Sequence, residues 1–420
     1  MIQKVMPGSR SGSTGIPASK SRAHRLLICA ALGSREVTII CQGISRDIEA
    51  TMNCLQAMGC GITREGSRIQ VRPAERIPEK SVLLPCGESG STLRFLLPVA
   101  GALGLEGVFR MEGRLPERPL QPLWDLLLRQ GMNLRREGDL LHFSGRLRSG
   151  DYAIPGNISS QYVSGLLFAL PLLEAESRLR VTGTVESADY IAMTEDALTL
   201  FGIPYEKTGN EYRIPPWNKD FGNRGIPALL EVEADWSSAA FFLAMGALSA
   251  KGVTARNLNP ESRQGDRRIL DLLKAFGAQV SEGENSVTVR KGELRGLRID
   301  ASAIPDLVPV LAAVASAAEG ETVIDHAERL RLKESDRLQT TAEMLRSLGA
   351  EIRETEDGLL IRGKRKLRGG RVSSFQDHRI AMSAAVAASV CQEPVIIEDA
   401  ECTDKSFPGF WEKLNALEMI

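Results

Sequence analysis

The sequence has no apolar segment long enough to cross a bilayer, since its longest run of small apolar residues covers only residues 307–318. Its seven cysteines include no CxxC pair, and its four histidines show no HExxH or other metal-binding spacing. A disulfide framework and a zinc site are therefore not expected, and the cysteines are predicted to be reduced thiols. The N-terminus has neither the apolar stretch of a secretory signal nor the Arg/Ser-rich pattern of a transit peptide, so we expect a cytoplasmic protein.

An excess of one charge is also missing. The chain has 52 basic and 53 acidic residues, a formal net charge of −1. No overall field draws it to a polyanion, so we expect no nucleic-acid or membrane partner, although this balance does not exclude local anion sites. The composition, 43% hydrophobic and 25% charged, is that of a globular protein, and 420 residues suggest two or three domains.

What the chain does contain is an internal repeat of about 72 residues. A helical segment ending in Leu-x-x-x-Gly recurs, and glycine after the last apolar residue is predicted to end each helix. Each copy continues as strand, polar turn and strand, then an alanine-rich helix, a short strand and a second helix. The glycines that mark the repeat are Gly59, Gly131, Gly202, Gly277 and Gly349.

The repeats predict two domains. Five copies are complete and residues 16–59 supply half of a sixth, which is too much chain for one core. We predict one domain over residues 18–229 and a second over 1–17 plus 230–420, with the switch following the Pro/Gly/Asn-rich stretch Pro215–Pro227. The remaining tail must complete the sixth copy, so residues 1–17 are expected to pair with the C-terminal half. The alternative is a long solenoid without an active site, which the polar residues below disfavour.

Residues of unusual chemistry occupy equivalent places in the repeats, at predicted helix N-termini, which bind anions. Lys333 and Arg337 are predicted to lie one turn apart on one helix, where like charges repel unless an anion lies between them. Arg379 at a helix start opposes the helix dipole in the same way. We therefore expect a cleft between the domains that binds small anions. The equivalent positions are Gly90, Ser160, Asp306 and His378 in one set, and Arg114, Ser187, Lys333 and Lys405 in the other.

A series of motifs in this order resembles the enolpyruvyl transferase family, and within it the branch that acts on shikimate 3-phosphate. The resemblance covers essentially the whole chain. It implies an α/β fold of two similar domains, each an inside-out α/β barrel of three βαβαββ repeats, with the active site in the interdomain cleft. The motifs are PASKSRAHR at 17–25, GESGSTLR at 87–94, RLPERP at 114–119, SSQ at 159–161, IPD at 304–306, LKESDRL at 332–338, DHR at 377–379 and DKSFP at 404–408.

The resemblance also implies roles for matching residues. Asp306 is expected to take the proton of the shikimate 5-hydroxyl, Glu334 to exchange a proton with C3 of phosphoenolpyruvate, and Lys20 to assist proton transfer. The resemblance implies no cofactor or metal, and we expect a monomer. Shikimate 3-phosphate is expected to be held by Lys20, Ser21, Arg25, Ser159, Ser160, Gln161, Ser187, Tyr190, Asp306 and Lys333. Phosphoenolpyruvate is expected to be held by Lys20, Gly90, Arg114, Gln161, Arg337, Arg379 and Lys405.

The implied reaction transfers the enolpyruvyl group of phosphoenolpyruvate to the 5-hydroxyl by addition and elimination, releasing phosphate on the route to chorismate and the aromatic amino acids. One alternative is an enolpyruvyl transferase acting on UDP-N-acetylglucosamine, which typically carries a reactive cysteine in the loop that matches Gly113–Arg118; this loop has none. Another is a non-catalytic anion-binding scaffold, which would not need Asp306 and Glu334 beside the cations. Glu88 stands where the family commonly has Asn, so its carboxylate must point away from the substrates, pair with an arginine or be protonated.

Overall fold

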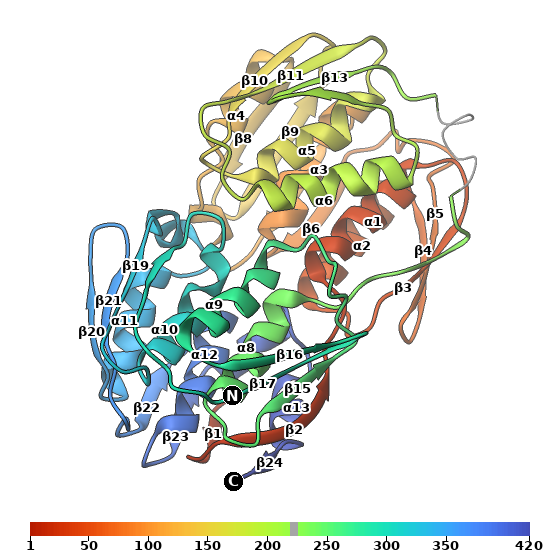
Figure 1. The fold of residues 1–420 in the computed structure, drawn as a ribbon. Coiled ribbons are helices and arrows are strands. Elements are labelled where there is room, and N and C mark those ends of the chain that lie inside the picture. The colour runs from red at the N-terminus through yellow and green to blue at the C-terminus, as the bar shows by residue number, and fades with distance from the viewer. Residues whose placement is uncertain (219–225) are drawn as a thin grey trace. The chain divides into compact units, whose positions relative to one another are not determined.

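A computed structural model describes residues 1–218 and 226–420, which form two compact units (Figure 1). Unit 1 comprises Met1–Ser19 and Glu233–Ile420, and unit 2 comprises Lys20–Val232. Part of the Pro215–Pro227 stretch lies outside the described residues. Within the described ranges, no helix combines the length and the apolar character that crossing a membrane requires.

The described residues of unit 2 form three four-stranded sheets and the helices that pack on them. Its helices are α1 (Lys20–Leu32), α2 (Arg46–Ala57), α3 (Gly90–Leu103), α4 (Leu123–Arg129), α5 (Ser160–Ala169) and α6 (Ala188–Leu200). Its strands are β3 (Val37–Ile40), β4 (Gly61–Glu65), β5 (Arg68–Arg72), β6 (Val82–Gly87), β7 (Gly107–Met111), β8 (Met132–Glu137), β9 (Leu140–Gly145), β10 (Asp151–Pro155), β11 (Ser177–Thr182), β12 (Glu206–Thr208), β13 (Glu211–Ile214) and β14 (Leu229–Glu231).

Unit 1 also has three sheets in its described part. Its helices are α8 (Trp236–Ala247), α9 (Ile269–Phe276), α10 (Val308–Ala315), α11 (Arg337–Ser347), α12 (His378–Ala387) and α13 (Phe410–Asn415). Its strands are β1 (Gln3–Val5), β2 (Arg10–Gly15), β15 (Val253–Arg256), β16 (Gln279–Gly283), β17 (Ser286–Arg290), β18 (Arg298–Asp300), β19 (Glu321–Asp325), β20 (Glu351–Glu354), β21 (Leu359–Arg362), β22 (Gly370–Ser373), β23 (Val395–Glu398) and β24 (Glu418–Met419).

One sheet pattern recurs in both units. In β6-β7-β9-β8 the first two strands are parallel, as a crossover helix requires, and a hairpin adds the other two antiparallel. The sheets β10-β11-β13-β12 and β18-β19-β21-β20 have the same order. The partial N-terminal copy, β3-β5-β4, receives its first strand from β14, which pairs parallel to β3, rather than from the tail as predicted. Residues 1–17 pair with the C-terminal half as predicted: they supply β1, which pairs with β23, and β2, which pairs with β15 and β24.

The repeat glycines end helices as the sequence predicts. Gly59, Gly131, Gly202, Gly277 and Gly349 all have φ between +63° and +108°, the left-handed region that glycine enters without steric cost. They follow α2, α4, α6, α9 and α11. Each glycine precedes the hairpin that completes the sheet already begun by the strand before the helix, as β8 and β9 join β7 after α4.

Helices form the centre of unit 1. The alanine-rich helices α8, α10 and α12 pack against one another and are buried around nearly their whole circumference. Helices that are apolar on all sides are buried, which explains why these segments show little amphipathic pattern. Their N-terminal ends carry the polar residues of the site.

Candidate active site

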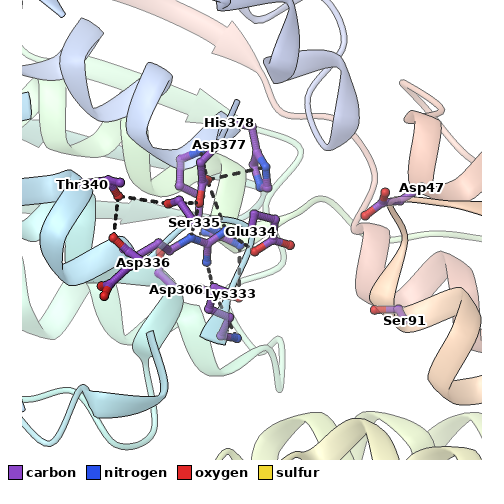
Figure 2. A network of polar contacts seen from close by, with 12 residues as sticks. Asp47, Ser91, Asp306, Lys333, Glu334, Ser335, Asp336, Thr340, Asp377 and His378 are labelled. Atoms are coloured by element: carbon purple, nitrogen blue, oxygen red, sulfur yellow. Dashed lines mark hydrogen bonds and ion pairs between the residues drawn. The ribbon is translucent and has the colours of Figure 1, made fainter. Parts of the chain in front are cut away.

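Arg337 is the centre of a buried ion-pair network in unit 1. Figure 2 labels its acidic partners Asp306, Glu334 and Asp377. Its Nε donates to Asp377 Oδ2 at 2.7 Å, its Nη1 to Asp306 Oδ1 at 2.8 Å and its Nη2 to Glu334 Oε2 at 2.7 Å. Burial lowers the pKa of Arg337, but the negative charges of Asp377, Glu334 and Asp306 outweigh burial and raise it. The guanidinium is therefore charged and held in one orientation by carboxylates.

Asp306, in the 3-10 helix η4 (Pro305–Leu307), faces three cations. Besides the bond from Arg337, its carboxylate lies 3.2 Å from Arg379 Nη2 and 3.6 Å from Lys333 Nζ. Burial raises the pKa of Asp306, but Arg379, Lys333 and Arg337 together hold it below its usual range. Asp306 is thus ionised at neutral pH. Its pKa depends on whether other negative groups also neutralise Arg337, Arg379 and Lys333.

Glu334 shares Arg337 with Asp306. Its side chain is 14% exposed, and it accepts a hydrogen bond from Arg337 Nη2. One guanidinium therefore bonds both carboxylates to which the family resemblance assigns proton transfer. The described part of unit 1 therefore brings together five of the predicted site residues: Asp306, Lys333, Glu334, Arg337 and Arg379.

Two expectations about this cluster are wrong. Lys333 and Arg337 do not share a helical face, because Asp336 caps α11 through the Gln339 amide and the helix begins only at Arg337. Lys333 precedes it in extended backbone, at φ −89° and ψ −159°. The positive charges of Lys333 and Arg337 were predicted to need a bound anion. Asp306 and Asp377, from distant parts of the chain, neutralise them instead.

Arg379 likewise needs no ligand to offset the dipole of α12. Its Nη1 donates to the Asp306 carbonyl at 3.0 Å, and Asp377, the N-cap, accepts its backbone N–H at 2.9 Å. A carboxylate at the N-cap is the favourable charge for a helix start. The predicted electrostatic cost of Arg379 is thereby removed within the chain itself.

The turn before α12 is strained. Phe375 and Gln376 both have positive φ, +53° and +55°, which side chains with a Cβ rarely adopt. The hydroxyls of Ser373 and Ser374 hold this turn by accepting the amides of Phe375 and Gln376. The strain fixes the fully buried Asp377 against Arg337.

Asp266, which sequence reasoning missed, is a second buried carboxyl of unit 1. It receives a short hydrogen bond from the Ser237 hydroxyl, while its Oδ1 has no hydrogen-bond partner in the described part of the chain. Burial and the nearby charge of Asp306 raise the pKa of Asp266 to about 6, against the opposing charge of Arg379. Asp266 therefore carries a proton in mildly acidic solution.

Lys20 begins α1 in unit 2 and bonds a carboxylate that was not predicted. Its Nζ donates to Asp47 Oδ2 at 2.8 Å, from a side chain that is 16% exposed. Asp47 lies in the first turn of α2, where its charge also favours the helix start. Lys20 is thus oriented by a buried acid and keeps part of its surface accessible.

Gln161, at the start of α5, links two segments of the predicted phosphoenolpyruvate site. Its amide oxygen accepts from Arg94 at 2.8 Å, and its amide nitrogen donates to the Ser91 hydroxyl at 2.9 Å. Gly90 begins α3 beside them. A Cβ at Gly90 would lie 2.7 Å from Arg94 Nη1 and 2.9 Å from Arg118 Nη1, so any larger residue would require these two guanidiniums to shift.

Arg25 is held inside unit 2. Its guanidinium donates to Thr194 Oγ1, to the Ser21 carbonyl and to the Tyr190 carbonyl, at 2.7 to 2.8 Å, and lies 5.1 Å above the centroid of Phe95. These bonds connect the start of α1 with the start of α6. Arg25 therefore positions Ser21 and Tyr190, two other predicted residues of the shikimate 3-phosphate site.

Of the remaining predicted residues, three lie at helix starts, and Lys405, which was predicted at a helix start, lies at a helix end. Ser159 caps α5 by accepting the Gln161 amide, and Ser160 is the first residue of that helix. Ser187 precedes α6 with a left-handed φ of +53°. Lys405 is buried at the end of the 3-10 helix η7 (Ala400–Lys405).

Arg114 differs from the prediction. It precedes a short 3-10 helix, η1 (Leu115–Glu117), instead of the α-helix that the repeat suggested, and pairs with Glu117 at 3.3 Å on the surface. Glu88 lies against the backbone of the same loop, since a Cβ at Gly113 would meet its Cδ at 2.7 Å.

Known sequences are similar to this chain over nearly its whole length. The profile of the family described as EPSP synthase (3-phosphoshikimate 1-carboxyvinyltransferase) matches residues 6–414. Proteins named 3-phosphoshikimate 1-carboxyvinyltransferase are similar over nearly the whole chain. That of Clostridium kluyveri is 44% identical over 98% of this chain and 96% of its own, and that of Clostridium acetobutylicum is 42% identical over 99% and 96%.

Solved structures show the same fold. An EPSP synthase from Acinetobacter baumannii has a TM-score of 0.80 at 25% identity, covering 100% of this chain and 98% of its own. The enolpyruvyl transferase NikO from Streptomyces tendae, at 18% identity, has a TM-score of 0.77 over 100% and 98%. The predicted α/β fold and the predicted transferase class are confirmed, and neither the UDP-N-acetylglucosamine enzyme nor a scaffold is favoured. This chain belongs to the EPSP synthase (3-phosphoshikimate 1-carboxyvinyltransferase) family.

Proposed function

We propose that this chain transfers the enolpyruvyl group of phosphoenolpyruvate to the 5-hydroxyl of shikimate 3-phosphate and releases inorganic phosphate, without a cofactor. The observation that carries the proposal is the pairing of Asp306 and Glu334 with one buried guanidinium, Arg337, beside Lys333 and Arg379. Fixed cations can neutralise phosphate and carboxylate groups, and two carboxylates beside them can move protons.

The proposed steps balance in protons. Asp306 accepts the proton of the 5-hydroxyl while the oxygen attacks C2 of phosphoenolpyruvate, and Glu334, which enters this step protonated, gives its proton to C3. In the second step Glu334 takes a proton back from C3, the C2–O bond to phosphate breaks, and the proton held by Asp306 leaves with phosphate, assisted by Lys20. Anionic substrates that share Arg337, Arg379 and Lys333 would weaken the hold of these cations on Asp306 and raise its pKa toward that of a useful base.

The roles of the other predicted residues are part of the same proposal. We assign Lys20, Gly90, Arg114, Gln161, Arg337, Arg379 and Lys405 to phosphoenolpyruvate, and Asp47, Arg94 and Arg118 join them as supporting groups. The residues assigned to shikimate 3-phosphate are Lys20, Ser21, Arg25, Ser159, Ser160, Gln161, Ser187, Tyr190, Asp306 and Lys333. These assignments draw on residues of both units.

The test is phosphate release by the purified protein from shikimate 3-phosphate plus phosphoenolpyruvate. Turnover of UDP-N-acetylglucosamine instead would overturn the proposal. Glu334→Ala should bind both substrates nearly as well as the native chain but turn over roughly a hundredfold more slowly or worse. The matched control is Glu328→Gln, on the exposed surface of the preceding 3-10 helix, which should keep native turnover.

A further inference from the structure

A chain of side-chain hydrogen bonds runs through unit 2 from His24 on α1 to Ser89, the N-cap of α3. His24 Nδ1 lies 2.7 Å from Thr51 Oγ1, and Thr51 Oγ1 lies 2.6 Å from Thr92 Oγ1. The Thr92 hydroxyl donates to Ser89 Oγ at 2.7 Å. All four side chains are buried, with exposed fractions of at most 1%, so water does not replace these bonds.

The bonds have a single direction. Ser89 Oγ accepts both the amide and the hydroxyl of Thr92, which uses the only proton of that hydroxyl. Thr92 Oγ1 must then accept from Thr51, and Thr51 must accept from His24. The proton of the neutral imidazole therefore lies on Nδ1. Nε2 has no hydrogen-bond partner among the described residues, as expected for a lone pair facing an apolar core.

His24 stays neutral in this environment. Burial lowers the pKa of His24 to about 3; the charge of Asp47 opposes this shift, and those of Lys20 and Arg25 add to it. The edge of Phe95, on α3, packs against the ring at a centroid distance of 6.3 Å. A neutral, single-tautomer histidine can act as a fixed donor across the pH range in which enzymes work.

Two side-chain hydrogen bonds connect α1 to α2, and the two bonds are one helical turn apart. Lys20 and His24 are four residues apart on α1, as are Asp47 and Thr51 on α2. Lys20 bonds Asp47, and His24 bonds Thr51 one turn deeper. From Thr51 the same network continues to α3, whose first residue is Gly90. The side chain of His24 thus connects the three helix starts that carry Lys20, Asp47 and Gly90.

We propose that His24 is a positioning residue for phosphoenolpyruvate, acting through Thr51 and Thr92 on Ser89 to fix the N-terminal turn of α3 relative to Lys20. This inference rests on the proposed function of the site. Nothing in it requires His24 to touch substrate, because its ring is sealed in the core. Loss of the network would loosen the turn that meets phosphoenolpyruvate, and would weaken binding of that substrate more than the chemical step.

The experiment compares KM and kcat of His24→Leu, His24→Asn and Thr51→Val. His24→Leu and Thr51→Val should each raise KM for phosphoenolpyruvate roughly fivefold to tenfold, the effect of one lost buried hydrogen bond, and the double variant should add little. His24→Asn places an amide donor near the Nδ1 position and should restore KM to within about twofold of native. Ile28→Val, a buried change on the same helix away from the network, controls for loss of stability.

An unchanged KM in both His24→Leu and Thr51→Val, or an equal rise in Ile28→Val, would overturn the inference. If His24→Leu fails to fold, Thr51→Val and His24→Asn carry the same comparison. A native chain that releases no phosphate refutes the proposed function instead. In that case nitrogen NMR of the ring still tests the network: we expect His24 neutral with its proton on Nδ1 between about pH 5 and 8, and a proton on Nε2 would refute it.

Discussion

Arg337 Nη1 lies 2.8 Å from Asp306 Oδ1, so a residue assigned to phosphoenolpyruvate is bonded to the residue assigned as the base. The same guanidinium bonds Glu334 and Asp377. One guanidinium is bonded to three acids. A negatively charged substrate that binds Arg337 therefore changes the proton affinities of Asp306 and Glu334 together. Binding and proton transfer are coupled through this side chain.

The first prediction concerns the stability of this network. Asp377→Ala leaves Arg337 buried without its most buried partner and removes the cap of α12, so it should cost roughly 3–5 kcal/mol of unfolding free energy. Chemical denaturation would measure it. Glu36→Ala, which breaks the exposed pair with Arg72, should cost less than about 1 kcal/mol. Equal losses in the two variants would contradict the view that burial sets the cost.

The repeat architecture could be predicted from the sequence because its signals are local. Gly59, Gly131 and Gly277 each follow an apolar residue at helical spacing and precede a hairpin pattern, so helix ends and hairpins are fixed within a few residues. Which strand completes a broken repeat is a long-range choice. The pairing of β14 with β3 joins residues almost two hundred positions apart, and no local pattern encodes it.

Two ion pairs of the candidate site, Lys20–Asp47 and Arg337–Asp377, were predictable only on their basic side. Motifs identified the cations Lys20, Arg337 and Arg379, because lysine and arginine at helix starts are conspicuous. The sequence assigns no role to their acidic partners Asp47 and Asp377, since Asp at a helix start is common. An unusual density of cations at helix starts is the one signal that could have predicted buried acids.

The second prediction separates base catalysis from binding. Asp306→Asn keeps the shape of the side chain but removes its charge, so kcat should fall by roughly 10²–10⁴. The positive charges of Arg337, Arg379 and Lys333 would then be less neutralised. Phosphoenolpyruvate, an anion, should therefore bind at least as tightly as to the native chain. Calorimetry and phosphate release would measure the two effects.

Asp300→Asn is the control for this change, because Asp300 lies in the same unit on an exposed side chain paired with His326. It should leave both kcat and binding as in the native chain. A weaker phosphoenolpyruvate complex in Asp306→Asn with native kcat would assign Asp306 to binding and reject it as the base.

The third prediction concerns the space at Gly90. The Cβ of Gly90→Ala would lie under 3 Å from guanidinium nitrogens of Arg94 and Arg118, so both side chains must shift. We expect KM for phosphoenolpyruvate to rise roughly tenfold or more, because these cations move from the turn that meets it, while KM for shikimate 3-phosphate changes little. Steady-state kinetics with each substrate varied in turn would show the difference. Equal rises in both KM values would instead indicate a general distortion of unit 2.

The fourth prediction is a pH dependence of stability set by Asp266. Its pKa is about 6 in the folded chain and close to 4 in an unfolded one, so between these values the folded state holds a proton that the unfolded state has lost. Stability from this group is therefore present below about pH 4 and declines as the pH rises through about 6, by on the order of 2 kcal/mol. Asp266→Asn should flatten this decline in denaturation curves measured between about pH 4 and 7. Asp271→Asn, on the exposed side of α9, should retain it, and a native slope in Asp266→Asn would show that another group carries the proton.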